Sequence, residues 1–179
     1  MKGSKTWKAD DMITPDRALQ ILRDEGCSEK VIAHCIAVSE HATEIAEKLV
    51  AEGKQVDVEL VTIGGLLHDL GRCRTHGIDH AVVGADIAAE LDLGPLIINI
   101  IKKHIGAGIT TEEAKELGLP EDDYIPVTLE EKIVAHADNF ISGNTRTTME
   151  QLIEKMKEKD LTEESMMRII ALAEEIGIY

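Results

Sequence analysis

Histidine and aspartate side chains recur along the sequence in a pattern that could bind metal. The most compact example is the pair His68–Asp69, which ends the apolar run GGLL and is followed by Gly71 and Arg72. An adjacent imidazole and carboxylate could cap a helix, form a buried ion pair or bind a metal ion. The third interpretation requires further ligands from elsewhere in the chain.

Two such ligands lie on segments that are predicted to be helical. His34 falls on the apolar stripe of residues 28–53, and Asp138 shares a face with apolar residues in the segment IVAHADNF. A buried carboxylate is costly unless it meets a cation, and a buried imidazole needs partners for both ring nitrogens. One divalent ion bound by these two residues, His68 and Asp69 would satisfy all four. Two nitrogen and two oxygen donors suit Mn, Fe, Co, Ni or Zn better than Mg or Ca.

Each residue also has an interpretation without metal. His34 could be a core histidine with satisfied ring nitrogens, Asp138 could form an ion pair on its helix, and Asp69 could accept backbone hydrogen bonds near a turn. Taken together, these interpretations are less convincing, because four residues buried for unrelated reasons would also have to fall in a recognisable order along the chain.

That order, His…His-Asp…Asp, resembles the HD-domain superfamily of metal-dependent phosphohydrolases. The stretches VIAHCIAVSEHATEIAEKL, GGLLHDLGR and EKIVAHADNF look like the first-histidine helix, the HD motif and the final-aspartate helix of that family. The resemblance covers roughly residues 28–142. It implies a compact all-α bundle that cleaves a phosphoester or phosphoanhydride bond through a metal-activated water.

Two further histidines resemble those of family branches that bind two metals. The segment HAVVGADIAAEL begins at His80, and His104 lies in IIKKHIGAG. Without metal, His80 would be a solvated residue at a helix start and His104 a helix-end imidazole favoured by the dipole. Gly84 would permit close helix approach. The resemblance implies six ligands for one or two divalent transition-metal ions: His34, His68, Asp69, His80, His104 and Asp138.

Cations near these ligands would orient phosphate oxygens. Arg72 stands where related HD motifs carry a cation that contacts substrate phosphate, so we assign it, with Asp69, to catalysis and also to substrate binding. Lys103 and Arg146 are further substrate-binding candidates. Arg146 ends the segment ADNFISGNTR, which is similar to one in the dinucleoside-tetraphosphatase branch. Arg72 could instead be an ordinary charge at a helix C-terminus.

The elements that must position these residues are all predicted to be helices, since no segment alternates with a period of two. Residues 1–13 are predicted to be a flexible lead-in and residues 14–179 a single helical domain. Gly71 is suited to a left-handed C-cap, and Thr128 with Glu131 forms a predicted capping box. The predicted helices cover residues 14–26, 28–53, 57–68, 81–91, 95–104, 112–117, 128–142, 147–158 and 163–176.

The composition agrees with helices and with a small anionic substrate. Of 179 residues 44% are apolar but only 2% aromatic, which favours packed helices over a β-sandwich. A formal net charge of −15 disfavours binding along a nucleic-acid backbone. Metal ions and local cations still allow a small anionic substrate to bind, and the resemblance implies that it is a small phosphorylated molecule such as a nucleotide.

The location expected from the sequence is cytoplasmic. The three cysteines lack CxxC spacing and indicate a reducing compartment rather than a disulfide framework. No apolar run reaches the length of a membrane span, and the start MKGSKTWKADD lacks the apolar core of a signal peptide. We therefore expect no membrane partner, and the sequence leaves the oligomeric state open.

The resemblance leaves two alternatives to hydrolysis. A minor HD branch uses a similar six-ligand set for diiron oxygenase chemistry, and other HD domains sense nucleotides or act as metal-stabilised scaffolds without catalysis. The complete ligand set favours an enzyme. Ile105 follows His104, so the adjacent His–His pair of the cyclic-di-GMP phosphodiesterase branch is absent.

Overall fold

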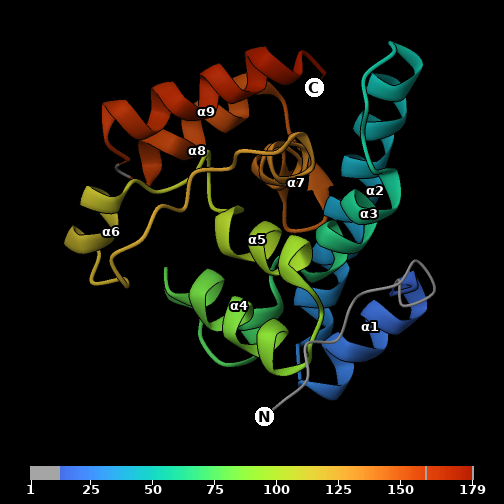
Figure 1. Ribbon diagram of the computed structural model, residues 1–179. Coiled ribbons are helices and arrows are strands. Elements are labelled where there is room, and N and C mark those ends of the chain that lie inside the picture. Colours follow the sequence, from blue (N-terminus) through green and yellow to red (C-terminus); the bar gives the residue numbers. More distant parts are fainter. Residues whose placement is uncertain (1–12, 160, 179) are drawn as a thin grey trace.

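The computed structural model describes residues 13–159 and 161–178. The predicted lead-in therefore lies, apart from Ile13, outside the described residues. The described part is helical, as predicted, with one two-stranded ribbon (Figure 1). Its elements are α1 (Pro15–Asp24), α2 (Glu29–Ala51), α3 (Val58–Leu67), the 3-10 helix η2 (Leu70–Cys73), α4 (His80–Glu90), α5 (Pro95–Lys103), α6 (Thr111–Glu116), α7 (Leu129–Asn139), β1 (Ile141–Ser142), β2 (Thr145–Arg146), α8 (Met149–Glu158) and α9 (Glu163–Ile176).

Side-chain caps explain where most of these helices begin. Each capping oxygen accepts a hydrogen bond from a backbone N–H that the first turn leaves unpaired. The predicted capping box of Thr128 and Glu131 is confirmed at the start of α7. The capping residues are Thr14, Ser28, Asp57, Thr110, Thr128, Thr148 and Thr162.

Helices α2 and α3 form the antiparallel pair on which the remaining helices pack. A Cβ on Gly65 of α3 would lie 2.7 Å from the Cα of Ser39 on α2, so only glycine allows this approach. The Ser39 hydroxyl donates to the carbonyl of Thr62 across the same contact. Helix α7 packs on both members of the pair, and α5 lies between α4 and α7 (Figure 1).

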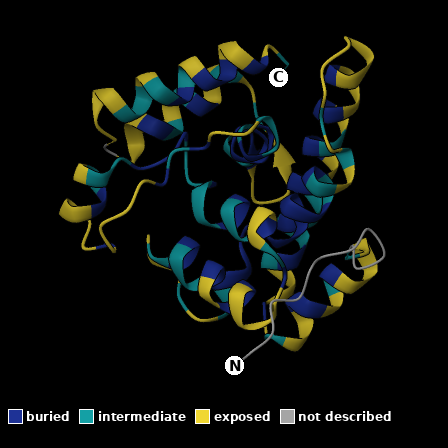
Figure 2. Ribbon diagram, viewed as in Figure 1, coloured by how far each residue is buried: buried dark blue, intermediate teal, exposed yellow. Residues whose placement is uncertain are grey.

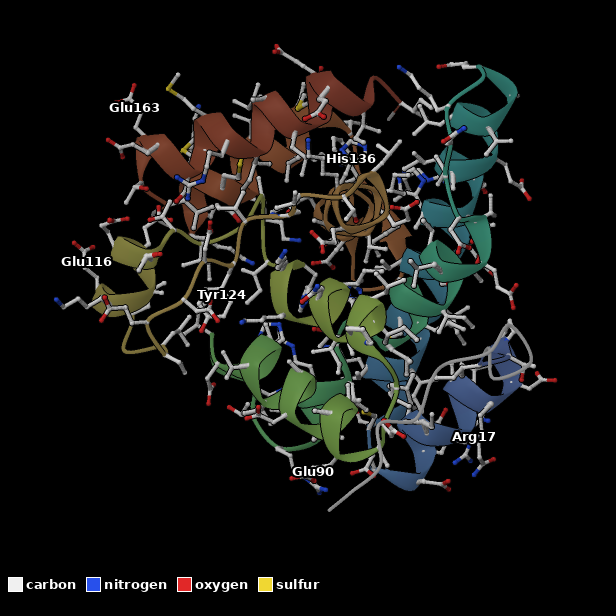
Figure 3. The ribbon with its side chains drawn as sticks, viewed as in Figure 1. Arg17, Glu90, Glu116, Tyr124, His136 and Glu163 are labelled. Atoms are coloured by element: carbon white, nitrogen blue, oxygen red, sulfur yellow. The ribbon has the colours of Figure 1, made fainter. Side chains whose placement is uncertain are left out.

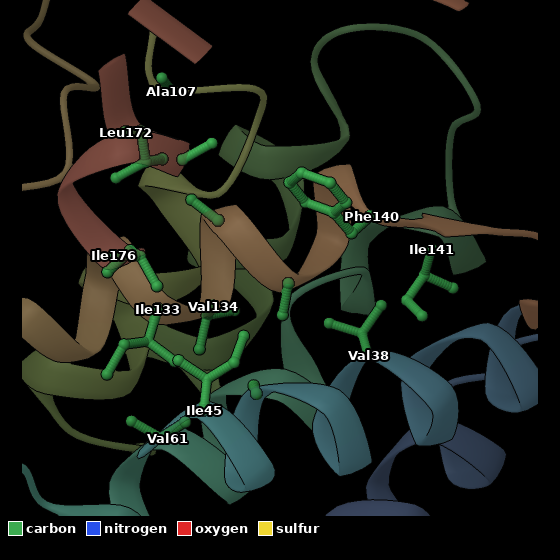
Figure 4. Packing of buried hydrophobic residues seen from close by; sticks show 14 of the residues in the cluster. Val38, Ile45, Val61, Ala107, Ile133, Val134, Phe140, Ile141, Leu172 and Ile176 are labelled. Atoms are coloured by element: carbon green, nitrogen blue, oxygen red, sulfur yellow. The ribbon is translucent and has the colours of Figure 1, made fainter. Parts of the chain in front are cut away.

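Two large apolar clusters flank the centre of the molecule, and buried positions concentrate on the inner helix faces (Figure 2). One cluster joins α2 and α7 to α8 and α9, and Phe140, Ile133 and Val134 lie fully buried within it (Figure 4). The other joins α1, α3, α4 and α5. Aliphatic side chains provide nearly all of this core, as the scarcity of aromatic residues requires.

Two local predictions were wrong. The helix that carries Asp138 ends at Asn139, not near residue 142, and the chain continues into the β1–β2 ribbon, which turns at Gly143 with φ +63°. Gly71 has no positive φ and is not a left-handed cap. It belongs to η2, where a Cβ would lie 1.9 Å from the carbonyl oxygen of His80, so close backbone contact is what requires glycine.

Across residues 13–159 and 161–178, no helix combines the length and the apolar character needed to span a bilayer.

Candidate metal centre

Five segments of the chain deliver histidine and aspartate side chains to one centre. Helix α2 carries His34, α7 carries Asp138, and α4 begins with His80. His68 and His104 follow the last residues of α3 and α5. Asp69 follows His68 as the N-cap of η2. The six predicted ligands are thus brought together, and four of them stand at helix ends, where a side chain is free to turn out of the helix surface.

Asp69 lies at the middle of this centre and divides its two oxygens between two groups of histidines. Its Oδ1 is 3.2 Å from Nε2 of His80 and 3.5 Å from Nε2 of His104. Its Oδ2 is 3.8 Å from Nε2 of His68 and 3.9 Å from Nε2 of His34. A carboxylate with one oxygen toward each group is arranged as a bridge between two cations.

Each of the four histidines is oriented by the same type of hydrogen bond. The ring Nδ1–H donates to a backbone carbonyl, so in the neutral ring Nε2 carries a lone pair and faces the centre. Such outer hydrogen bonds fix the tautomer that binds metal. The pairs are His34 with Gly143 at 2.6 Å, and His68 with Gly65, His80 with Gly77 and His104 with Ile101, each at 2.7 Å.

This orientation leaves the centre with acceptors that lack protein donors. The Nε2 of His68 is buried and has no hydrogen-bond partner in the described part of the chain. Nε2 atoms of His80 and His104 face each other at 3.1 Å, and Nε2 of His34 faces Oδ1 of Asp138 at 2.9 Å. Lone pairs this close repel each other unless a cation lies between them, so the donor set fits divalent transition metals.

Two subsets have ligand atoms near enough to share one ion each. One consists of His34, His68 and Asp138, and the other of His68, Asp69 and His104. His80 lies beside the second subset through its contacts with Asp69 and His104. His68 belongs to both subsets, so the two possible ion positions are neighbours.

The electrostatics favour bound cations. Burial tends to raise the pKa of Asp69, but the charge of His68 and the neighbouring rings of His104 and His80 hold that pKa far below its usual range. Burial also tends to raise the pKa of Asp138, but His34 and His68 lower that pKa strongly. Both carboxylates are therefore ionised. Burial lowers the pKa of His68, yet the two aspartates outweigh it and raise that pKa to about 9.

Arg72 approaches this centre from η2. Its Nε is 3.2 Å from Oδ1 of Asp69, and its Nη1 donates to the carbonyl of His76 at 2.9 Å. Its Nη2 makes no hydrogen bond to the described residues, and the side chain lines the cavity at the centre. The guanidinium is thus held at two points, with a third free.

The two other predicted cations lie elsewhere. Lys103 is paired with Glu131 at 3.2 Å, where that buried carboxylate also caps α7. Arg146 on β2 is paired with Glu44 at 2.8 Å on the surface. Neither lines the cavity, because the helix end of α5 and the turn of the ribbon direct them away from it. We therefore do not retain either as a phosphate ligand.

The cavity at the centre has a volume of about 820 Å³ and reaches from the histidines to α6, α8 and α9. Its walls include polar residues that the sequence analysis did not identify: Asn139, Lys155 and Lys159. Asn139 donates to the carbonyl of Gly106 at 2.8 Å and so ties α7 to the loop after His104. Asn139 follows a candidate ligand directly, which was a usable signal, whereas nothing distinguished the lysines among the charges of α8.

The three remaining histidines lie in other surroundings. His136 faces α9, and its Nε2–H donates to the carbonyl of Ile178 (Figure 3). His41 is buried in α2 with neither ring nitrogen hydrogen-bonded to the described residues. His76 is exposed at the rim of the cavity.

The sequence is similar to those of several known proteins. A protein of Methanocaldococcus jannaschii that bears the name uncharacterized protein is 54% identical over 90% of this chain and 96% of its own length. The tRNA (cytidine(56)-2'-O)-methyltransferase of Thermoplasma volcanium is 46% identical over 89% of this chain, which spans only 46% of that protein.

Among solved structures, the HD domain of the L. monocytogenes phosphodiesterase PgpH in complex with cyclic-di-AMP has the same fold. Its TM-score is 0.57 at 18% sequence identity, over 90% of this chain and 96% of that one. The family described as HD domain matches residues 31–143, a segment that contains all six candidate ligands. The chain therefore belongs to the HD domain family.

Proposed function

We propose that this protein is a metal-dependent phosphohydrolase that cleaves a phosphoester or phosphoanhydride bond in a small, nucleotide-like substrate. The observation that carries the proposal is the position of Asp69, whose two oxygens face two separate groups of histidine Nε2 atoms. A centre built for two neighbouring divalent ions is typical of phosphoryl-transfer enzymes.

The candidate ligands are His34, His68, Asp69, His80, His104 and Asp138. Divalent ions bound there would supply a water of lowered pKa and would stabilise negative charge on the phosphoryl group. The carbonyl hydrogen bonds of the four histidines hold the ligand atoms in place before metal binds, so little reorganisation is required.

Arg72 is the proposed phosphate ligand among the protein side chains. Because Asp69 and the carbonyl of His76 hold the guanidinium, its free Nη2 is available to a phosphate oxygen at the mouth of the centre. A charge-assisted hydrogen bond of this kind both orients the phosphate and offsets its charge. The same contact orients the Asp69 carboxylate.

The names of similar proteins guide the choice of substrates. PgpH is described as a phosphodiesterase and binds cyclic-di-AMP, which makes cyclic dinucleotides reasonable candidates here. The methyltransferase relative includes RNA in its name, so short RNA is a further candidate. We do not propose methyl transfer, since this chain spans less than half of that relative and its centre is built from metal ligands.

The deciding experiment is a screen for phosphate or nucleotide release with Mn²⁺, Co²⁺, Ni²⁺ and Fe²⁺. Substrates would include nucleoside mono- and polyphosphates, dinucleoside polyphosphates, cyclic nucleotides and dinucleotides, short RNA and p-nitrophenyl phosphate. We expect turnover in at least one class, and expect EDTA and Asp69→Ala to abolish it. Full metal loading with no turnover in any class would refute the proposal. Oxygen consumption would instead support an oxygenase, and ligand binding without turnover would support a sensor.

A further inference from the structure

Lys155 lies on the wall of the same cavity, far along the sequence from the candidate ligands. Helix α8 packs on the core through Leu152 and Met156, which are 3% and 2% exposed. Lys155 stands three residues after Leu152, on the same helix face, and is half-buried. It lines the cavity together with Asp69 and Asp138.

The ammonium group of Lys155 has no partner among the residues that the structure describes. Within the described ranges it makes no hydrogen bond and no ion pair, whereas the lysines of α5 and α7 are paired with carboxylates. Burial and the positive charge of Lys159 lower the pKa of Lys155, and the negative charge of Asp138 offsets this only in part. A partly desolvated cation without a partner is unfavourable, and an anionic ligand in the cavity would relieve it.

The carboxylates on the α6 side of the cavity do not pair with Lys155. The carboxylate of Glu113 on α6 already accepts hydrogen bonds from Arg168 at 2.6 and 2.7 Å. Glu116 is exposed on the outer turn of α6 (Figure 3). Lys159, the C-cap of α8, also lines the cavity, so this end of α8 places two cations on the wall. A chain with a net charge of −15 thus presents an unpaired positive group inside its cavity.

We propose that Lys155, with Lys159 next to it, binds a second anionic group of the substrate while the phosphate to be cleaved lies at the histidine–aspartate centre near Arg72. This inference rests on the proposed function and narrows its substrate class. The substrate then carries at least two anionic groups, as nucleoside polyphosphates and dinucleotides do. The cavity of about 820 Å³ is far larger than one phosphate requires and falls in the range of small-molecule sites.

The kinetic test compares substrates with one and with several anionic groups. Lys155→Met keeps most of the apolar stem of the side chain and removes its charge. We expect this variant to raise KM about 10-fold or more for nucleoside polyphosphates, with kcat within about twofold. KM for p-nitrophenyl phosphate should stay unchanged. Lys155→Arg should recover part of the affinity. Lys157→Met is the matched control, because Lys157 is exposed on the same helix and does not line the cavity.

A second measurement does not depend on turnover. Metal-loaded wild-type protein is treated with an acetylating reagent, with and without the methylene-bridged analogue of ADP, and modification of each lysine is followed by mass spectrometry. We expect the analogue to slow acetylation of Lys155 several-fold and to leave Lys157 unaffected. Protection without turnover on any substrate would support Lys155 as an anion ligand while refuting the hydrolase. Turnover with unchanged KM in Lys155→Met, and no protection, would overturn the role of Lys155 alone.

Discussion

Gly71 and Gly84 hold the backbones of η2 and α4 in direct contact. A Cβ on Gly71 would lie 2.6 Å from the amide nitrogen of Gly84, and one on Gly84 would lie 2.9 Å from the amide nitrogen of Gly71. Asp69 immediately precedes η2, and His80 begins α4. The two glycines therefore set the distance between the Asp69 carboxylate and one of the histidines that face it.

Gly84→Ala should disturb this distance. The added methyl group also meets Ile101 at 2.9 Å, so α4 must shift from both η2 and α5. Overpacking of this kind destabilises by about 1–3 kcal/mol, and the shift separates His80 from Asp69. We expect a lower free energy of unfolding in urea and fewer bound metal ions by elemental analysis. Asp86→Ala, at an exposed position of the same helix, should change neither. A stable Gly84→Ala protein with full metal content would contradict this role for the glycine contact.

Metal content provides a direct test of the six ligands. Protein purified without chelators should carry about two transition-metal ions per chain, because the ligand atoms form two subsets. Asp69→Ala should remove most of both ions, since Asp69 faces both subsets, whereas His80→Ala should remove about one. His76→Ala is the histidine control, because that ring is exposed at the rim. Wild-type protein with only trace metal would refute the metal centre.

Arg72→Ala tests the proposed phosphate contact. Loss of one charge-assisted hydrogen bond, about 1.5–3 kcal/mol, should lower kcat/KM roughly 10- to 150-fold. Arg72→Lys should restore part of the loss, because charge returns without the planar guanidinium geometry. Metal content must be measured alongside, since Nε of Arg72 also contacts Asp69. Normal kcat/KM in the alanine variant with metal unchanged would show that phosphate is bound by other groups.

The sequence was sufficient for the helices and for the identities of the candidate ligands. Apolar periodicity and capping residues act locally, so the helix limits lie within a few residues of those predicted. The order of the histidine and aspartate residues along the chain does not depend on the conformation of the loops. The hairpin turn was missed because its strands are only two residues long, too short to show alternation. That turn matters for the centre, since its Gly143 carbonyl accepts the Nδ1–H of His34.

Contacts between distant segments could not be predicted from the sequence. The partners of Lys103 and Arg146 come from other helices, and neither spacing nor composition places Glu131 or Glu44 beside them. Lys155 was not predicted to be near the centre, yet it lines the cavity. It looked like one of several surface charges on an amphipathic helix, and only the packing of α8 beside the centre makes it part of the cavity wall.

The last prediction concerns His41, which is 2% exposed and whose ring nitrogens lack hydrogen-bond partners among the described residues. Burial, Arg146 and His136 lower its pKa from 6.5 to about 4, although Glu44 acts in the opposite direction. Between these two values the unfolded chain binds a proton that the folded chain does not. The free energy of unfolding should therefore fall as the pH drops from about 6.5 to about 4, by about 3 kcal/mol from this residue.

His41→Leu should remove that contribution and also the two unpaired nitrogens, which are costly to bury. We expect the variant to be more stable than wild type at pH 7 and the difference to widen as the pH falls toward 4. Urea unfolding of both proteins in EDTA across this range measures the difference directly, because the metal-binding groups and the other histidines contribute equally to both curves. If the free energies of unfolding of the two proteins changed with pH in parallel, the protonation of His41 would not change on unfolding. The ring would then have a partner in solution.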